Sequence, residues 1–194
     1  MAEQSLFSEI DIRFLIITAR GFAWIETLRN SAAQVELVRD PQACEMALST
    51  QEFDIVLYDD TTFTVATSQV IEELHLQNPH ALIAVISDDL SQDYYEGIIA
   101  AGGADAILSS VDMTMMLQRL SVLVRQQQKN NELASRTRHL HAINLLSQKL
   151  HHSAHPTMMI VDALELICNY FDVAAVVITI AYDGYYHLHA GTNG

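Results

Sequence analysis

Short apolar runs alternate with amphipathic segments over the first 125 residues. Apolar runs predict five strands, at residues 13–19, 34–39, 54–59, 81–87 and 106–108. Segments with helical character separate them, at residues 21–30, from 41 onward, at 65–76 and at 92–101. Because unbroken apolar runs are typical of strands buried on both faces, this order predicts an α/β fold. We expect a doubly wound, five-stranded parallel sheet with helices on both sides.

Glycine, proline and aspartate set several of the predicted helix ends. Pro41 can occupy the first turn of a helix. Gly102 and Gly103 give the backbone freedom that a helix C-terminus requires. Asp112 can cap a further helix that begins at Met113.

That last helix continues without Gly or Pro to about Ser153. Its first part carries an apolar stripe that should pack on the sheet, and its middle is polar. A stripe at spacings of three and four then returns at Leu140, Ile143, Leu146 and Leu150. We expect residues 126–153 to form a helical linker that dimerises as a coiled coil. A lone solvated spacer is the alternative.

The segment 154–194 predicts one helix and one hairpin. Pro156 can open the helix, and the apolar run 173–182 is a strand followed by the turn Asp183-Gly184 and a second strand at 185–190. Such a set cannot bury enough surface to be stable alone. We expect this segment to be the start of a second, α+β domain that ends early here or is completed by a partner.

Charge is distributed unevenly along the 194 residues, whose net charge is −14. Residues 1–112 hold 19 acidic and 4 basic side chains, whereas residues 113–150 hold 1 and 6. The acidic first part argues against a nucleic-acid partner, since phosphate neutralisation needs Lys and Arg. Two cysteines without a CxxC pair, and apolar runs shorter than a membrane span, predict a cytoplasmic protein that does not enter membranes.

The run FDIVLYDD ends a predicted strand on two carboxylates, Asp59 and Asp60. Ligands bind outside the carboxyl ends of the strands in open α/β sheets, so this end is the candidate site. No glycine-rich phosphate loop and no convergent acid and base set occur, which predicts a protein that is not an enzyme. His151 and His155 have a spacing that can ligate zinc, but a solvated set of histidines is the favoured interpretation.

Three motifs in the correct order resemble the receiver domain of two-component response regulators. They are FDIVLYDD, the strand end at Ser87 and the run GGADAILSS at 102–110, and the resemblance covers about residues 11–125. It implies a flavodoxin-like sheet with Asp59 as acceptor of a phosphoryl group from a partner histidine kinase. It also implies that Ser87 hydrogen-bonds the phosphoryl group.

The chain departs from the receiver pattern where that family neutralises phosphoryl charge. Receivers hold Mg²⁺ with acidic residues after the first strand and use a lysine after the fifth. Here the first strand ends in Thr18, Ala19 and Arg20, and Ser110 takes the lysine position. Mg²⁺ could still bind Asp59 together with Asp60 or Asp88. Alternatively, Arg20 could pair with Asp59 and leave it inert. We therefore expect a degenerate receiver that is phosphorylated inefficiently.

Residues from about Ile143 onward resemble the beginning of a GAF domain. The resemblance rests on an apolar helix followed by the hairpin VAAVVITIAYDGYYHLHAG. Together the two resemblances imply a response regulator module that relays a phosphorylation or protein-contact signal through a dimerising helix to a GAF-containing output. A histidine kinase or another signalling protein would be its partner. A pseudo-receiver that serves only for dimerisation and docking is the alternative.

Overall fold

The computed structural model describes residues 12–31, 34–152, 163–164, 167–168, 175–182 and 185–192. The chain divides into two compact units between Lys129 and Asn130. The first unit contains a five-stranded sheet with its helices, and the second contains a two-stranded sheet. Each unit is described by itself.

The sheet of the first unit is entirely parallel, with strand order β2-β1-β3-β4-β5. Its strands are β1 (Arg13–Ile17), β2 (Gln34–Val38), β3 (Ile55–Asp59), β4 (Leu82–Ser87) and β5 (Asp105–Leu108). The predicted doubly wound sheet is confirmed. Because the chain moves outward from β1 to β2 and then crosses back to β3, the strand order reverses beside the carboxyl end of β1.

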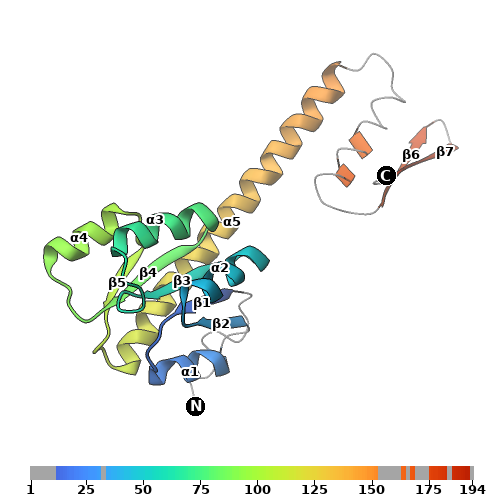
Figure 1. Ribbon diagram of the computed structural model, residues 1–194. Helices are drawn as coiled ribbons and strands as arrows, with labels where there is room; N and C mark the ends of the chain where they lie inside the picture. Colours follow the sequence, from blue (N-terminus) through green and yellow to red (C-terminus); the bar gives the residue numbers. More distant parts are fainter. Residues whose placement is uncertain are drawn as a thin grey trace. The chain divides into compact units, whose positions relative to one another are not determined.

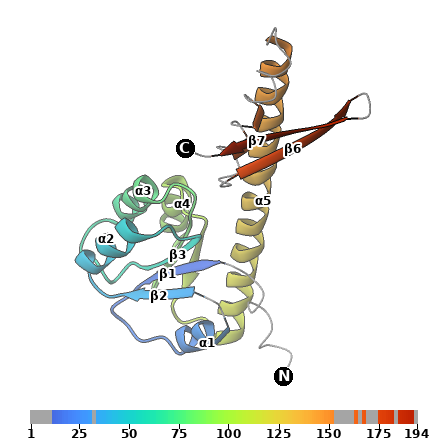
Figure 2. The ribbon, with the colours of Figure 1, turned by 90° about the vertical axis from the view of Figure 1, so that its right-hand side faces the viewer.

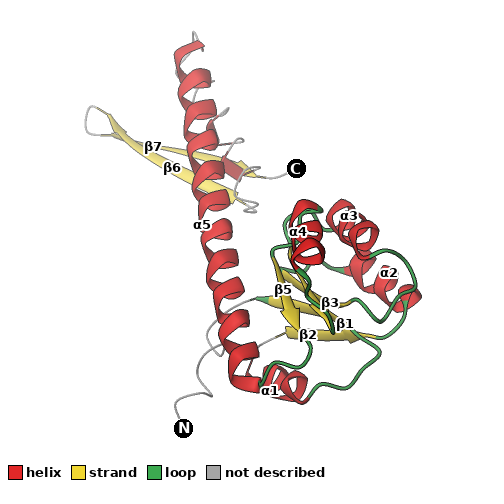
Figure 3. Cartoon of the chain, turned by 90° about the vertical axis from the view of Figure 1, so that its left-hand side faces the viewer, coloured by secondary structure: helices red, strands yellow, loops and turns green. Residues whose placement is uncertain are grey.

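Helices cover both faces of this sheet (Figures 1 and 3). α1 (Ala23–Ser31) and the first turns of α5 (Met113–His152) pack on one face. α2 (Pro41–Thr50), α3 (Thr67–Gln77) and α4 (Gln92–Ala100) pack on the other. Every predicted helix of this unit is present, with ends shifted by at most two residues.

Two apolar cores explain why the strands read as unbroken apolar runs. In β1, Phe14 and Ile16 face the core beneath α1 and α5. Leu15 and Ile17, between and after them, face the core beneath α2, α3 and α4. Successive side chains of a strand point to opposite faces, and here both faces are buried.

Side-chain and glycine caps fix several of the helix ends, as the sequence predicted at three of them. Asp40 Oδ1 accepts a hydrogen bond of 2.8 Å from the amide of Ala43, and Pro41 occupies the first turn of α2. Asp112 Oδ1 likewise accepts a bond of 2.8 Å from the amide of Met115 at the start of α5. These contacts satisfy amides that have no partner inside the helix.

Two glycines close the C-terminus of α4. The amide of Gly103 donates to the carbonyl of Ile98 at 2.9 Å, and that of Gly102 donates to the carbonyl of Ile99 at 3.0 Å. Gly102 has a φ of 98°, which L side chains rarely adopt. This pair of bonds is a Schellman motif, and it turns the chain directly into β5.

α5 is one uninterrupted helix of 40 residues (Figure 2). Leu120, Leu123 and Val124 are buried in the core of the first unit. Further along, Leu133, Leu140 and Ile143 are more than half exposed. No helix in the described part of the chain has a stretch long and apolar enough to cross a membrane.

The second unit contains an antiparallel hairpin of β6 (Ala175–Tyr182) and β7 (Tyr185–Thr192), in which Tyr182 lies opposite Tyr185. The predicted pairing of these two strands is confirmed. The predicted turn at 183–184 and most of the predicted helix from Pro156 lie outside the described residues. His155, one of the two histidines with zinc-ligand spacing, lies outside them as well.

Candidate functional site

The candidate site lies at the carboxyl end of the sheet, beside the reversal of strand order. β3 ends at Asp59, whose side chain is fully buried. The segments that follow β1, β4 and β5 supply Arg20, Asp88 and Ser109. Parallel strands bring these loops to one edge of the sheet, although they are far apart in the sequence.

Arg20 holds Asp59 with a bidentate ion pair. Its Nη2 donates to Oδ1 at 2.6 Å, and its Nε donates to Oδ2 at 2.8 Å. The side chain of Arg20 is 31% exposed, so the pair joins a buried carboxylate to a guanidinium that is partly exposed to solvent. This is the pairing that the sequence left open as one of two fates for Asp59. The planar guanidinium matches both carboxylate oxygens at once, which a lysine ammonium cannot do.

Two threonines complete the shell around Asp59. Thr18 Oγ1 donates to Oδ2 at 2.6 Å. Thr61 donates to Oδ1 twice, from its hydroxyl at 2.8 Å and from its amide at 3.2 Å. With the two bonds from Arg20, five donors meet a carboxylate that has about four lone-pair sites. Both oxygens of Asp59 are therefore saturated.

These contacts decide the charge of Asp59. Burial by itself would raise the pKa of this carboxyl, because it disfavours the charged form. The hydrogen bonds from Arg20, Thr18 and Thr61 outweigh burial and hold the pKa of Asp59 below its ordinary value. Asp59 is thus an ionised carboxylate that is fully neutralised by its own chain.

Arg20 extends the network to the loops that follow β4 and β5. Its Nη1 donates to Asp88 Oδ1 at 2.6 Å, and Ser109 Oγ donates to the same oxygen. The hydrogen bonds from Ser109 and Arg20 lower the pKa of Asp88. The guanidinium carbon also lies 5.0 Å from the centre of the Phe22 ring, a cation–π distance. Arg20 therefore connects the ends of β1, β3 and β4 directly, and that of β5 through Asp88.

The structure brings Thr18, Arg20 and Asp59 together, but it places the other candidates elsewhere. Asp60 Oδ2 accepts a hydrogen bond of 2.7 Å from the hydroxyl of Tyr94 on α4. Ser87 is buried and donates to the carbonyl of Asp89 at 2.9 Å. Ser110 is exposed, and the serine that reaches the network is its neighbour Ser109.

This donor set does not fit Mg²⁺. A magnesium ion needs carboxylate oxygens with free lone pairs, in near-octahedral geometry. Both oxygens of Asp59 are taken, and the positive guanidinium of Arg20 lies where a second cation would be repelled. Among the described residues, no three His, Cys, Asp or Glu side chains come together as a metal site.

Thr61 and Tyr94 have roles that sequence reasoning missed. Thr61 follows the two acids directly, and a hydroxyl two residues after a strand-end carboxylate is a signal that could have been used. Tyr94 bonds Asp60 and, at 2.9 Å, Thr67. It lies in the first turn of α4, and nothing in its sequence context points to Asp60.

Comparison with protein-family models and with curated protein sequences gives no match for this chain. Solved structures do match. A CheY-like response regulator receiver domain protein from Methanospirillum hungatei JF-1 has 16% identity and a TM-score of 0.55, over 61% of this chain and 97% of that one. A response regulator from Thermotoga maritima has 16% identity and a TM-score of 0.51, over 59% and 98%.

A longer match, NtrX from Brucella abortus in complex with ADP, has 13% identity and a TM-score of 0.60, over 75% of this chain and 36% of that one. Identities this low show the fold alone. The first unit therefore has the fold of a response regulator receiver domain, the fold that the sequence motifs implied.

Proposed function

We propose that this chain is a signalling module whose receiver-fold domain works by protein contact, without phosphorylation of Asp59. The bidentate pair between Arg20 and Asp59 carries this proposal. The partner would be a histidine kinase or another signalling protein. The signal would pass along α5 to an output domain that begins, by resemblance to GAF domains, in residues 154–194.

The chemistry of phosphoryl transfer supports this reading. A carboxylate that attacks an anionic phosphoryl group needs a free lone pair and a cation that neutralises the transferred charge. Asp59 has its lone pairs occupied by Arg20, Thr18 and Thr61. Before attack, Arg20 would have to release at least one oxygen, and a divalent cation would have to enter beside it. Each of these steps costs free energy, and this cost does not arise in a receiver that has the acidic pair.

Incubation with acetyl phosphate and Mg²⁺ tests the proposal. We expect the intact mass of the chain to stay unchanged, because Asp59 lacks both a free lone pair and a metal site. A receiver domain that has the acidic pair and the lysine serves as positive control in the same reaction. A stoichiometric gain of one phosphoryl mass that disappears in Asp59→Ala would contradict the proposal.

The exposed apolar side chains of α5 support dimerisation by its second half. Leu133 and Leu140 are seven residues apart, Ile143 is three further on, and all three are more than half exposed. This spacing is that of a coiled-coil seam, and exposure of these apolar side chains to water is unfavourable. We propose that this face pairs with the same face of a second copy.

Light scattering after size-exclusion chromatography checks this pairing. We expect the chain to be a dimer at tens of micromolar, and Leu140→Lys combined with Ile143→Lys to be a monomer. Ala134→Lys combined with His141→Lys adds the same number of lysines at exposed positions outside this stripe and should leave the dimer intact. A wild-type chain that elutes as a monomer at this concentration would rule out the paired helix.

A further inference from the structure

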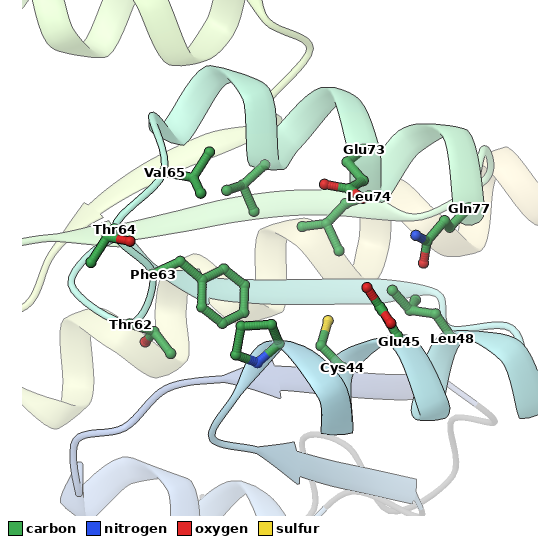
Figure 4. Close-up of a pocket in the computed structure, with 12 residues that line it drawn as sticks. Cys44, Glu45, Leu48, Thr62, Phe63, Thr64, Val65, Glu73, Leu74 and Gln77 are labelled. Atoms are coloured by element: carbon green, nitrogen blue, oxygen red, sulfur yellow. The ribbon is translucent and has the colours of Figure 1, made fainter.

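A cavity of about 280 Å³ lies between α2 and α3 (Figure 4). This volume is close to the lower end of the range for small-molecule sites. Three segments line it: α2, α3 and the loop between β3 and α3. The lining residues include Cys44, Glu45, Phe63, Val70, Glu73 and Leu74.

The inner wall of the cavity is apolar. Cys44, Val70 and Leu74 are buried, and the Phe63 ring packs at 5.6 Å from that of Tyr58. Burial, assisted by the nearby charge of Glu45, raises the pKa of the Cys44 thiol to about 11. The thiol therefore stays protonated near neutral pH and offers an apolar surface rather than a nucleophile. This wall suits an aliphatic or aromatic group.

Two carboxylates flank the cavity from its two helices. Glu45 belongs to α2 and Glu73 to α3, and both act electrostatically on Cys44. Both are exposed, and within the described ranges neither makes a salt bridge. The lining contains no Lys, Arg or His. Together with the acidic character of residues 1–112, this gives the cavity a negative potential that attracts cations.

We propose that this cavity binds a small organic cation, with an apolar body against the inner wall and an ammonium group between Glu45 and Glu73. The lining loop also carries the shell of Asp59: Thr61 donates to Asp59, and Thr62 Oγ1 accepts from the amide of Ala19 at 3.3 Å. A bound cation would thus touch the loop that holds the network together. The role of this cation as a signal that acts on the loop rests on the function proposed above, whereas the binding of the cation does not.

Titration of the full chain with 2-phenylethylamine tests the proposal. Binding is measured by calorimetry and by NMR of the methyl groups. We expect saturable binding with shifts at the methyls of Leu48, Val70 and Leu74. 2-Phenylethanol should bind more weakly and phenylacetate should not bind, because only the amine complements the carboxylates. Raising the salt concentration should weaken the binding of the amine, because salt screens its attraction to the carboxylates. Equal binding of all three compounds, or shifts confined to other regions, would overturn the proposal.

Charge-neutral variants give the second measurement. Glu45→Gln and Glu73→Gln should each weaken the amine by about 2- to 5-fold, the range for a solvent-exposed ion pair. The double variant should weaken it by about 10-fold. Glu72→Gln, on α3 but outside the lining, should leave the affinity unchanged. An unchanged affinity in the double variant would also overturn the proposal. Phosphorylation of Asp59 is measured without the amine, so the two proposals can fail separately.

Discussion

Arg20→Ala is expected to lower the free energy of unfolding by about 2–4 kcal/mol, the largest effect of any substitution considered. The reason is that Asp59 is fully buried and would lose Arg20, the one cation that pairs with it among the residues that the structure describes. The figure lies slightly below that for a completely buried pair, since the side chain of Arg20 is 31% exposed and the bonds from Thr18 and Thr61 remain. Urea unfolding followed by Trp24 fluorescence measures it, because this single tryptophan is buried in the first unit.

Two further variants separate the charge effect from a general loss of packing. Arg29→Ala removes an exposed arginine whose pair with Glu26 is 3.6 Å long, and it should cost less than about 0.5 kcal/mol. Adding Asp59→Asn to Arg20→Ala removes the orphaned charge and should restore part of the lost stability. If Arg20→Ala costs no more than Arg29→Ala, the ion pair does not stabilise this domain.

Gly103→Ala is expected to lower the free energy of unfolding by about 1–3 kcal/mol. An added Cβ would lie 2.5 Å from Cγ2 of Ile98 and 2.9 Å from its backbone oxygen. Ile98 is buried, and its carbonyl accepts the hydrogen bond from the Gly103 amide, so neither atom can move freely. Thermal or urea unfolding of the variant measures this cost.

Gly97→Ala is the matched control for this substitution. Gly97 lies inside α4, and an added Cβ there meets nothing within 4 Å. Alanine is a better helix former than glycine, so this variant should gain about 0.5–1 kcal/mol. The free energy of unfolding is therefore expected to change with opposite sign at the two glycines. A Gly103→Ala variant that is more stable than the wild type would show that the end of α4 can relax.

The sequence predicted the first unit well because its signals are local and strong. Five unbroken apolar runs mark strands that have a core on each face, as Phe14 and Leu15 show. Asp112 and Gly102 mark helix ends through their own chemistry, a side-chain cap and a positive φ. Features of this kind depend on a few neighbouring residues, so they can be read without knowing what packs against them.

The site was harder to predict because it depends on which side chains meet across loops. Asp59 could be singled out because it ends a strand, and Arg20 because it stands where receiver domains have acidic residues. The choice between a metal and Arg20 needed the distances, which show both oxygens of Asp59 engaged. Asp60 looks equivalent to Asp59 in the sequence, but it turns toward Tyr94, 34 residues away. No local pattern encodes that contact.

The pair between Arg20 and Asp59 also fixes how this domain depends on its surroundings. A bound metal ion exchanges with solvent, so its occupancy follows the ionic composition of the compartment. The guanidinium of Arg20 is tethered by the backbone, and its effective concentration beside Asp59 does not change on dilution or chelation. On the function proposed above, the electrostatic state of this pocket is set when the chain folds, and we expect it to stay the same in magnesium-rich and magnesium-poor conditions.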